Sequence, residues 1–197
     1  TYEPVKDFAP VTQGTLYMYV LVVTVNNPVM NIKDMIAWVK AKPGALTYGS
    51  TGIGGGNHLA GELFNLMTQT KSIHVPYKGS ALALADLLGK LRAIGVSGLK
   101  RSSSLPEVPT LDELGLKGFE VTQWQAVVLP AGTPKAIVDR LHREVVRALK
   151  MPDVIERLGT QGGNELVGNT PEEFAQVIKN DLAKYAKLVK DAGIKIE

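Results

Sequence analysis

The chain has 197 residues, a formal net charge of +3, 45% hydrophobic and 21% charged residues, and no cysteine. This composition is ordinary for a globular protein with one large or two smaller cores, and the missing cysteines exclude disulfides, thiolate nucleophiles and cysteine metal sites. Basic residues alternate with acids along expected helices and do not gather beside aromatics, so we expect no nucleic-acid binding. No apolar run is long enough to span a membrane.

Strand and helix patterns alternate through the first two thirds of the chain. The expected strands are rich in β-branched or aromatic residues and cover 16–25, 45–48, 72–75, 92–96 and 119–129. The expected helices follow polar caps at Asn31, Asn57, Ser80 and Thr110, and the helix after Ser80 runs through Leu88. This alternation predicts an α/β fold with mainly parallel sheets flanked by helices.

The last third of the chain is predominantly helical. Thr133-Pro134 combines a cap with a proline at the first helical position, and Pro152 opens a short helix closed by Gly159. Thr170-Pro-Glu-Glu173 is a capping box that starts a long helix ending at Gly193.

The most informative segment is Tyr48-Gly-Ser-Thr-Gly-Ile-Gly-Gly-Gly-Asn-His58. It predicts a strand, a glycine-rich loop and a helix start, which together direct backbone N–H groups toward an anion. The alternative is a plain surface connection. The candidate ligand-binding residues of this loop are Ser50, Thr51, Gly52, Gly54, Gly55, Gly56, Asn57 and His58.

The loop fails the common enzyme templates. A dinucleotide fingerprint needs glycine where Asn57 stands, a P-loop needs lysine where Gly55 stands, and a nucleophile elbow needs glycine where Tyr48 stands. The three histidines, His58, His74 and His142, are not paired at metal-ligand spacing. We therefore assign no catalytic residue, no metal site and no cofactor.

Two further segments have equally plain alternatives. Tyr77, Lys78 and Gly79 precede another helix cap and are placed to close over an anion, or they form a strand-to-helix turn with a surface lysine. Trp124 on the last long strand either lines a cleft or packs in the interior.

Six motifs occur in an order that resembles the Bug family, the solute-binding proteins of tripartite tricarboxylate transporters. They are Pro4-Val-Lys-Asp-Phe-Ala-Pro-Val-Thr12, Leu46-Thr-Tyr-Gly-Ser50, His58-Leu-Ala-Gly-Glu62, His74-Val-Pro-Tyr-Lys-Gly-Ser80, Pro130-Ala-Gly-Thr-Pro134 and Gly168-Asn-Thr-Pro-Glu-Glu-Phe174. The resemblance implies a periplasmic binding protein of type II-like fold without catalysis. It implies a small carboxylate ligand, the membrane subunits of a tripartite transporter as partners, and no direct membrane insertion.

The resemblance also implies two lobes. We expect lobe 1 to comprise 1–20 and 125–197 with the C-terminal helices, and lobe 2 to comprise 21–124 with the glycine-rich ligand loop. Candidate hinges are 20–25 and 123–129.

The chain departs from the family pattern at two places. Family members begin with a further strand, loop and helix of lobe 1, and carry another strand and helix between Gly89 and Lys90, so lobe 1 is expected to be incomplete. No signal peptide is visible at Thr1. Two alternatives stay open: a truncated paralogue without ligand binding, and an α/β enzyme that uses the Ser50–His58 loop as an oxyanion site with His58 or His74 as base.

Overall fold

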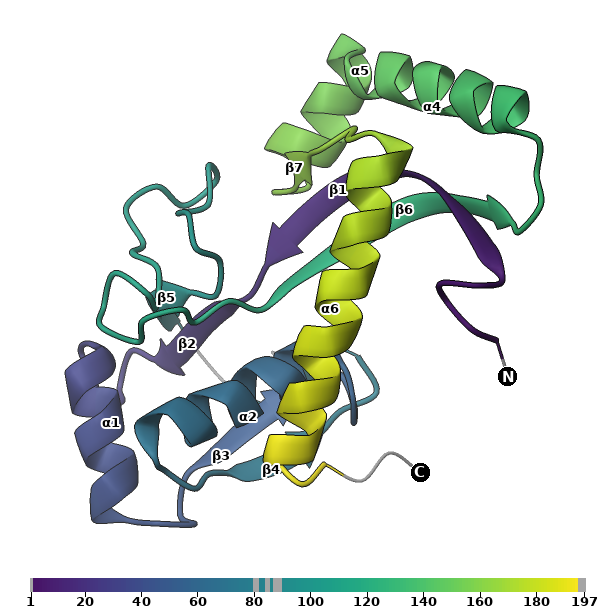
Figure 1. Cartoon of the computed structure of the whole chain (residues 1–197). Coiled ribbons are helices and arrows are strands. Elements are labelled where there is room, and N and C mark those ends of the chain that lie inside the picture. The colour runs from purple at the N-terminus through teal and green to yellow at the C-terminus, as the bar shows by residue number, and fades with distance from the viewer. Residues whose placement is uncertain (1, 80–81, 84–85, 87–89, 195–197) are drawn as a thin grey trace. The chain divides into compact units, whose positions relative to one another are not determined.

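The computed structural model describes residues 2–79, 82–83, 86 and 90–194 (Figure 1). Most of the helix expected after Ser80, and the junction at Gly89, lie outside the described residues. The chain folds as two compact units. Unit 1 comprises Thr1–Tyr17 and Gln123–Ala186, and unit 2 comprises Met18–Thr122 and Lys187–Glu197. The division into lobes expected from the resemblance stays a prediction.

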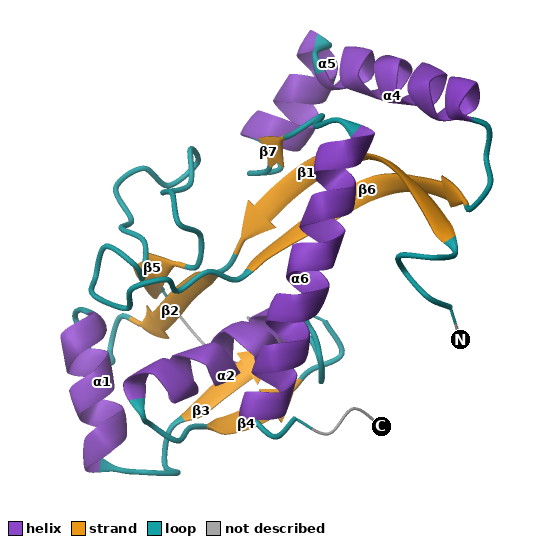
Figure 2. Ribbon diagram, in the orientation of Figure 1, coloured by secondary structure: helices purple, strands orange, loops and turns teal. Residues whose placement is uncertain are grey.

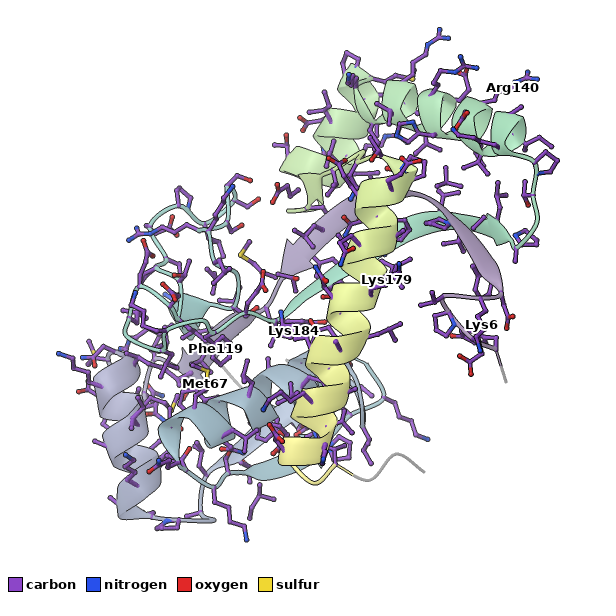
Figure 3. All side chains as sticks on the ribbon, viewed as in Figure 1. Lys6, Met67, Phe119, Arg140, Lys179 and Lys184 are labelled. Atoms are coloured by element: carbon purple, nitrogen blue, oxygen red, sulfur yellow. The ribbon has the colours of Figure 1, made fainter. Side chains whose placement is uncertain are left out.

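Unit 1 is built on a three-stranded sheet in the order β6-β1-β7, with β7 antiparallel to β1. Its strands are β1 (Phe8–Met18), β6 (Thr122–Pro130) and β7 (Glu165–Leu166). Its helices are α4 (Lys135–Leu149), α5 (Pro152–Val154), the π-helix η1 (Ile155–Thr160) and α6 (Pro171–Asp191). Exposed cations such as Arg140 and Lys179 are spread over separate helices of this unit (Figure 3).

Polar contacts join the beginning of unit 1 to its C-terminal part. The Thr12 hydroxyl donates to the Asn169 carbonyl over 2.7 Å, and the Asn169 side chain accepts from the Gln13 N–H over 2.9 Å. The capping box predicted before α6 is confirmed, because Thr170 N–H donates to Glu173 Oε2 and Glu173 N–H donates to Thr170 Oγ1. The start of α6 is therefore fixed both locally and by β1.

Unit 2 holds two two-stranded sheets, β2-β5 and β3-β4 (Figure 2). Its elements are β2 (Val20–Thr24), α1 (Ile32–Ala41), β3 (Thr47–Ser50), α2 (Gly56–Thr68), β4 (Ile73–Pro76) and β5 (Leu91–Val96). The predicted α/β class is confirmed. The predicted parallel pairing holds for β3 and β4, which a single crossover helix connects, whereas β2–β5 and β1–β7 are antiparallel.

Two sequence-based boundaries are wrong. The strand predicted over 16–25 is interrupted at Tyr19, where both backbone polar groups bond Ser97. The helix predicted after Thr110 is only a series of turns, although its capping box with Glu113 forms. Thr110 bridges to Val96, and Gly115, with a φ of +105°, ends the capped segment after a few residues.

Ser97 forms hydrogen bonds with residues near both ends of the longer segment of unit 2, 18–122. Its hydroxyl accepts from Tyr19 N–H over 2.8 Å and donates to the Val121 carbonyl over 2.5 Å. Its backbone N–H donates to the Tyr19 carbonyl, and its carbonyl accepts from Val121 N–H. Ser97 is 2% exposed, so these four bonds form in the interior, beside two of the three places where the chain passes between units.

Candidate functional site

The glycine-rich loop connects the end of β3 to the start of α2, as the sequence predicts. Gly52 and Gly54 have φ values of +132° and +77°, which side chains on L residues strongly disfavour. Gly55 is extended and precedes the first helical residue, Gly56. Within the described chain, the N–H groups of Gly56 and Asn57 have no acceptor, so the loop leaves two helix-terminal donors open.

Asn57 does not cap α2, contrary to prediction, because Gly55 occupies the cap and provides no side chain. The Asn57 side chain instead turns back to the loop, where Oδ1 accepts from the Thr51 hydroxyl over 3.0 Å and from the Thr51 N–H over 3.3 Å. Asn57 Oδ1 also accepts from His58 N–H over 3.1 Å, so Asn57 closes the loop on itself and satisfies one amide of the first helical turn.

Ser50 lies under the loop with no exposed surface. Its Oγ lies 2.5 Å from His74 Nε2 and accepts from Gly52 N–H over 3.1 Å. A serine beside an imidazole is the arrangement that the enzyme alternative needs. A hydroxyl without exposed surface does not present itself to a substrate, and this geometry instead fixes the end of β3.

His58 supports the loop from the first turn of α2. Its Nδ1 accepts from Gly54 N–H over 3.0 Å, and its ring is stacked on that of His74 with centroids 4.0 Å apart. Burial lowers the pKa of both imidazoles, and for His74 the neighbouring His58 lowers the pKa further, while Glu62 opposes the effect of burial at both rings.

His58 and His74 form a histidine cluster with two further residues, Tyr48 and Glu62. The sequence did not point to Tyr48 and Glu62 as site residues. The Tyr48 hydroxyl donates to Glu62 Oε1 over 2.5 Å, and burial, followed by this bond, raises the pKa of Tyr48 above its ordinary value of 10.0. Glu62 Oε1 also lies 4.0 Å from His58 Nε2. The spacing of His58 and Glu62, one helical turn apart, was the available signal for this contact.

The second predicted loop starts beside the first, because Tyr77 N–H donates to the Ser50 carbonyl over 2.9 Å. The Tyr77 hydroxyl donates to Asp86 Oδ2 over 2.7 Å, and this bond raises its pKa. Lys78 is exposed, and Gly79 has a φ of +120°. The structure thus brings the two predicted loops together within unit 2.

Trp124, the remaining predicted site residue, lies in unit 1. Its Nε1 donates to Asp181 Oδ2 over 2.7 Å, and its ring contacts Phe174 edge to face with centroids 5.2 Å apart. These contacts account for its position by packing, and a role in ligand binding stays a prediction.

A cavity of about 270 Å³ adjoins the histidine cluster. It is lined by residues of unit 2, namely Ile53, His58, Glu62, His74 and 192–194. No group of three potential metal-ligating side chains occurs in the part of the chain that the structure describes. None of the described helices has the length and hydrophobicity needed to cross a bilayer.

Comparison with known proteins gives consistent likenesses. Residues 1–194 match the family described as "Tripartite tricarboxylate transporter family receptor". A relative from Pseudomonas sp. (strain P51), "UPF0065 protein in tcbD-tcbE intergenic region", is 35% identical over 95% of this chain. The chain spans 62% of the length of that relative.

Two solved structures share the fold. "R. palustris Rpa4515 with adipate" is 32% identical with a TM-score of 0.85, and the match covers 98% of this chain and 71% of that one. "Structure of periplasmic binding protein BugD" is 32% identical with a TM-score of 0.84, covering 100% of this chain and 73% of that one. These likenesses confirm the expected periplasmic binding protein fold.

Proposed function

This chain belongs to the tripartite tricarboxylate transporter receptor family, and from that premise we propose that it binds a small organic carboxylate through the Ser50–His58 loop. Tyr77, Lys78 and Gly79 form the second part of the proposed site. The observation that carries the proposal is the pair of open amides, Gly56 and Asn57, at the N-terminus of α2. Helix-terminal N–H groups and the helix dipole favour an anion at that point.

The proposed ligand class is a dicarboxylate or a related organic acid. The solved relative with adipate supports this class. Backbone amides bind a carboxylate well but contact little else of the ligand. The exposed Lys78 supplies a positive charge on the adjacent loop, so a second carboxylate is favoured over a neutral group.

We propose an extracytoplasmic location and delivery to the membrane subunits of a tripartite transporter, as the family description supports. We propose no catalysis at the loop. The enclosed Ser50 hydroxyl supports this view, and Ser50→Ala should leave any background hydrolysis of an activated ester unchanged.

The proposal is tested by isothermal titration calorimetry with adipate, malate, succinate and citrate. The critical variant is Asn57→Asp, which keeps an oxygen for Thr51 but adds a negative charge beside the proposed anion. We expect at least about a tenfold loss of affinity, or ~1.4 kcal/mol. An acid in the first turn also stabilises a helix, so the melting temperature should stay level or rise.

Asn31→Asp is the matched control, because Asn31 caps α1 in the same unit and its side chain accepts from Asp34 N–H. This variant should bind like the wild type. Equal weakening by both variants would indicate a general charge effect and contradict a site at α2. Absence of binding by the wild type to every acid would overturn the proposed function.

A further inference from the structure

We infer that His58 is a positioning residue, which holds the glycine-rich loop in its binding conformation through a neutral imidazole and does not itself contact the carboxylate. The inference rests on the proposed function of the loop and assigns a different role to one of its residues. A protonated imidazole would release the loop, so protonation of His58 should lower the affinity for the carboxylate.

The hydrogen bond from Gly54 determines the form of the ring. Gly54 N–H donates to His58 Nδ1 over 3.0 Å, so Nδ1 must carry a lone pair. The ring proton of the neutral form therefore sits on Nε2. Glu62 Oε1 lies 4.0 Å from that nitrogen, which is beyond an ordinary hydrogen bond but within electrostatic reach.

The position of Gly54 makes this bond important. With a φ of +77°, Gly54 lies in the middle of the loop, two residues before the open amide of Gly56. His58 is on the first turn of α2 and is 5% exposed, so its ring is a fixed support. The imidazole thereby ties the loop to the helix whose N–H groups are proposed to bind the anion.

The groups around His58 differ in whether they favour or disfavour its protonated form. Glu62 on α2 favours the protonated ring, but its Oε1 already accepts from Tyr48 on β3. His74 on β4 is stacked on the ring, and the nearby His58 lowers the pKa of His74, so the two rings disfavour being charged together. Residues 192–194, which line the adjacent cavity, carry no ionisable side chain. Burial is the largest influence, and it lowers the pKa of His58.

Protonation distinguishes the two possible roles of His58. If the ring contacted the carboxylate, its positive charge would strengthen anion binding in acid. If the ring positions the loop, protonation turns Nδ1 from an acceptor into a donor that faces Gly54 N–H, and the loop is displaced. Affinity then falls by about tenfold for each pH unit below the pKa of the ring.

The experiment combines nitrogen NMR of the histidine rings with calorimetry of adipate binding from about pH 8 to about pH 5.5. We expect the Nε2–H tautomer of His58 at the upper pH, and loss of amide-exchange protection at Gly54 as the ring protonates. His58→Asn places an uncharged acceptor near the position of Nδ1. This variant should keep most of the affinity. Protonation of adipate weakens binding to both proteins equally, so any further loss of affinity in acid should occur in the wild type and not in His58→Asn.

His58→Leu should lose Gly54 protection and affinity together, and His142→Asn in unit 1 is the matched control that should change neither. An Nδ1–H tautomer, or wild-type affinity that rises in acid relative to His58→Asn, would overturn the inference. If the wild type binds no acid, the proposed function fails, whereas the tautomer and the Gly54 protection still decide whether the ring holds the loop.

Discussion

The two units bury their apolar side chains very differently. In unit 1 the buried apolar residues of the described chain are Val11, Val138 and Phe174. In unit 2 they form a much longer set, comprising Val23, Val29, Ile32, Met35, Val39, Leu59, Phe64, Ile94, Val96, Val108, Leu111, Leu116, Phe119, Val121 and Leu188. Unit 1 therefore depends on a few buried apolar residues and on the polar contacts of Asn169, whereas unit 2 distributes its stability over many buried apolar residues.

This contrast predicts unequal stability of the two units, since burial of apolar surface is the main favourable contribution to folding. The chain contains a reporter for each unit. Trp124 lies in unit 1, and Trp38 lies on α1 in unit 2. Trp38→Phe and Trp124→Phe variants make each unfolding transition visible alone, and we expect the unit 1 transition at the lower urea concentration.

The largest effect is expected for Phe174→Ala. Phe174 has no exposed surface and contacts Trp124, so its loss should reduce the free energy of unfolding of unit 1 by about 3–5 kcal/mol. The urea midpoint followed through Trp124 should fall while the Trp38 transition stays in place. Phe174→Leu should cost less. A joint shift of both transitions would show that the units unfold together.

A smaller effect is expected for Ser97→Ala in unit 2. Removal of the hydroxyl leaves Tyr19 N–H and the Val121 carbonyl without this partner in the interior, which should cost about 1–3 kcal/mol. The Trp38 transition is the appropriate measurement. Ser102→Ala removes a hydroxyl that bonds only in an exposed turn and should be near neutral. Equal effects of the two substitutions would contradict the role assigned to Ser97.

A similar cost is expected for Gly61→Ala, through overpacking. A Cβ at Gly61 would lie 2.3 Å from the Tyr48 ring, so the ring must move away from Glu62, at a cost of about 1–3 kcal/mol. Gly14→Ala in unit 1 is the control, because its Cβ would only reach ordinary contact with the Gln125 carbonyl. If Trp38 reported no shift for Gly61→Ala, the close packing of Tyr48 on α2 would be disproved.

Local chemistry explains which parts of this structure the sequence could predict. The Thr170 capping box, the Asn31 cap and the loop between β3 and α2 depend on neighbouring residues, and they are confirmed. The histidine cluster depends on the parallel register of β3 and β4, which places Tyr48 opposite His74. No local pattern specifies that register. The break at Tyr19 likewise follows from a distant partner, Ser97.

The smallest effect is expected from pH, and it falls on unit 2, the unit expected to be the more stable. The imidazoles of His58 and His74 have pKa values lowered from 6.5, first by burial, and both lie in unit 2. Above pH 6.5 both are neutral whether the unit is folded or unfolded, so they do not affect stability. Below pH 6.5 the unfolded chain binds protons before the folded unit does, and the free energy of unfolding of unit 2 therefore falls until the folded pKa is reached.

The measurement is the Trp38 transition between about pH 7.5 and about pH 5.5. Two carboxyls of unit 2, Asp112 and Glu113, also have lowered pKa values, but they lose their favourable contributions only as the pH falls below their ordinary values of 3.8 and 4.5. The chosen range therefore isolates the imidazoles. Replacing both His58 and His74 by Asn should flatten the profile, and an unchanged slope would place the acid sensitivity outside the cluster. If the profile flattens, acid destabilises the unit with the larger core, because burial in that core keeps the imidazoles neutral.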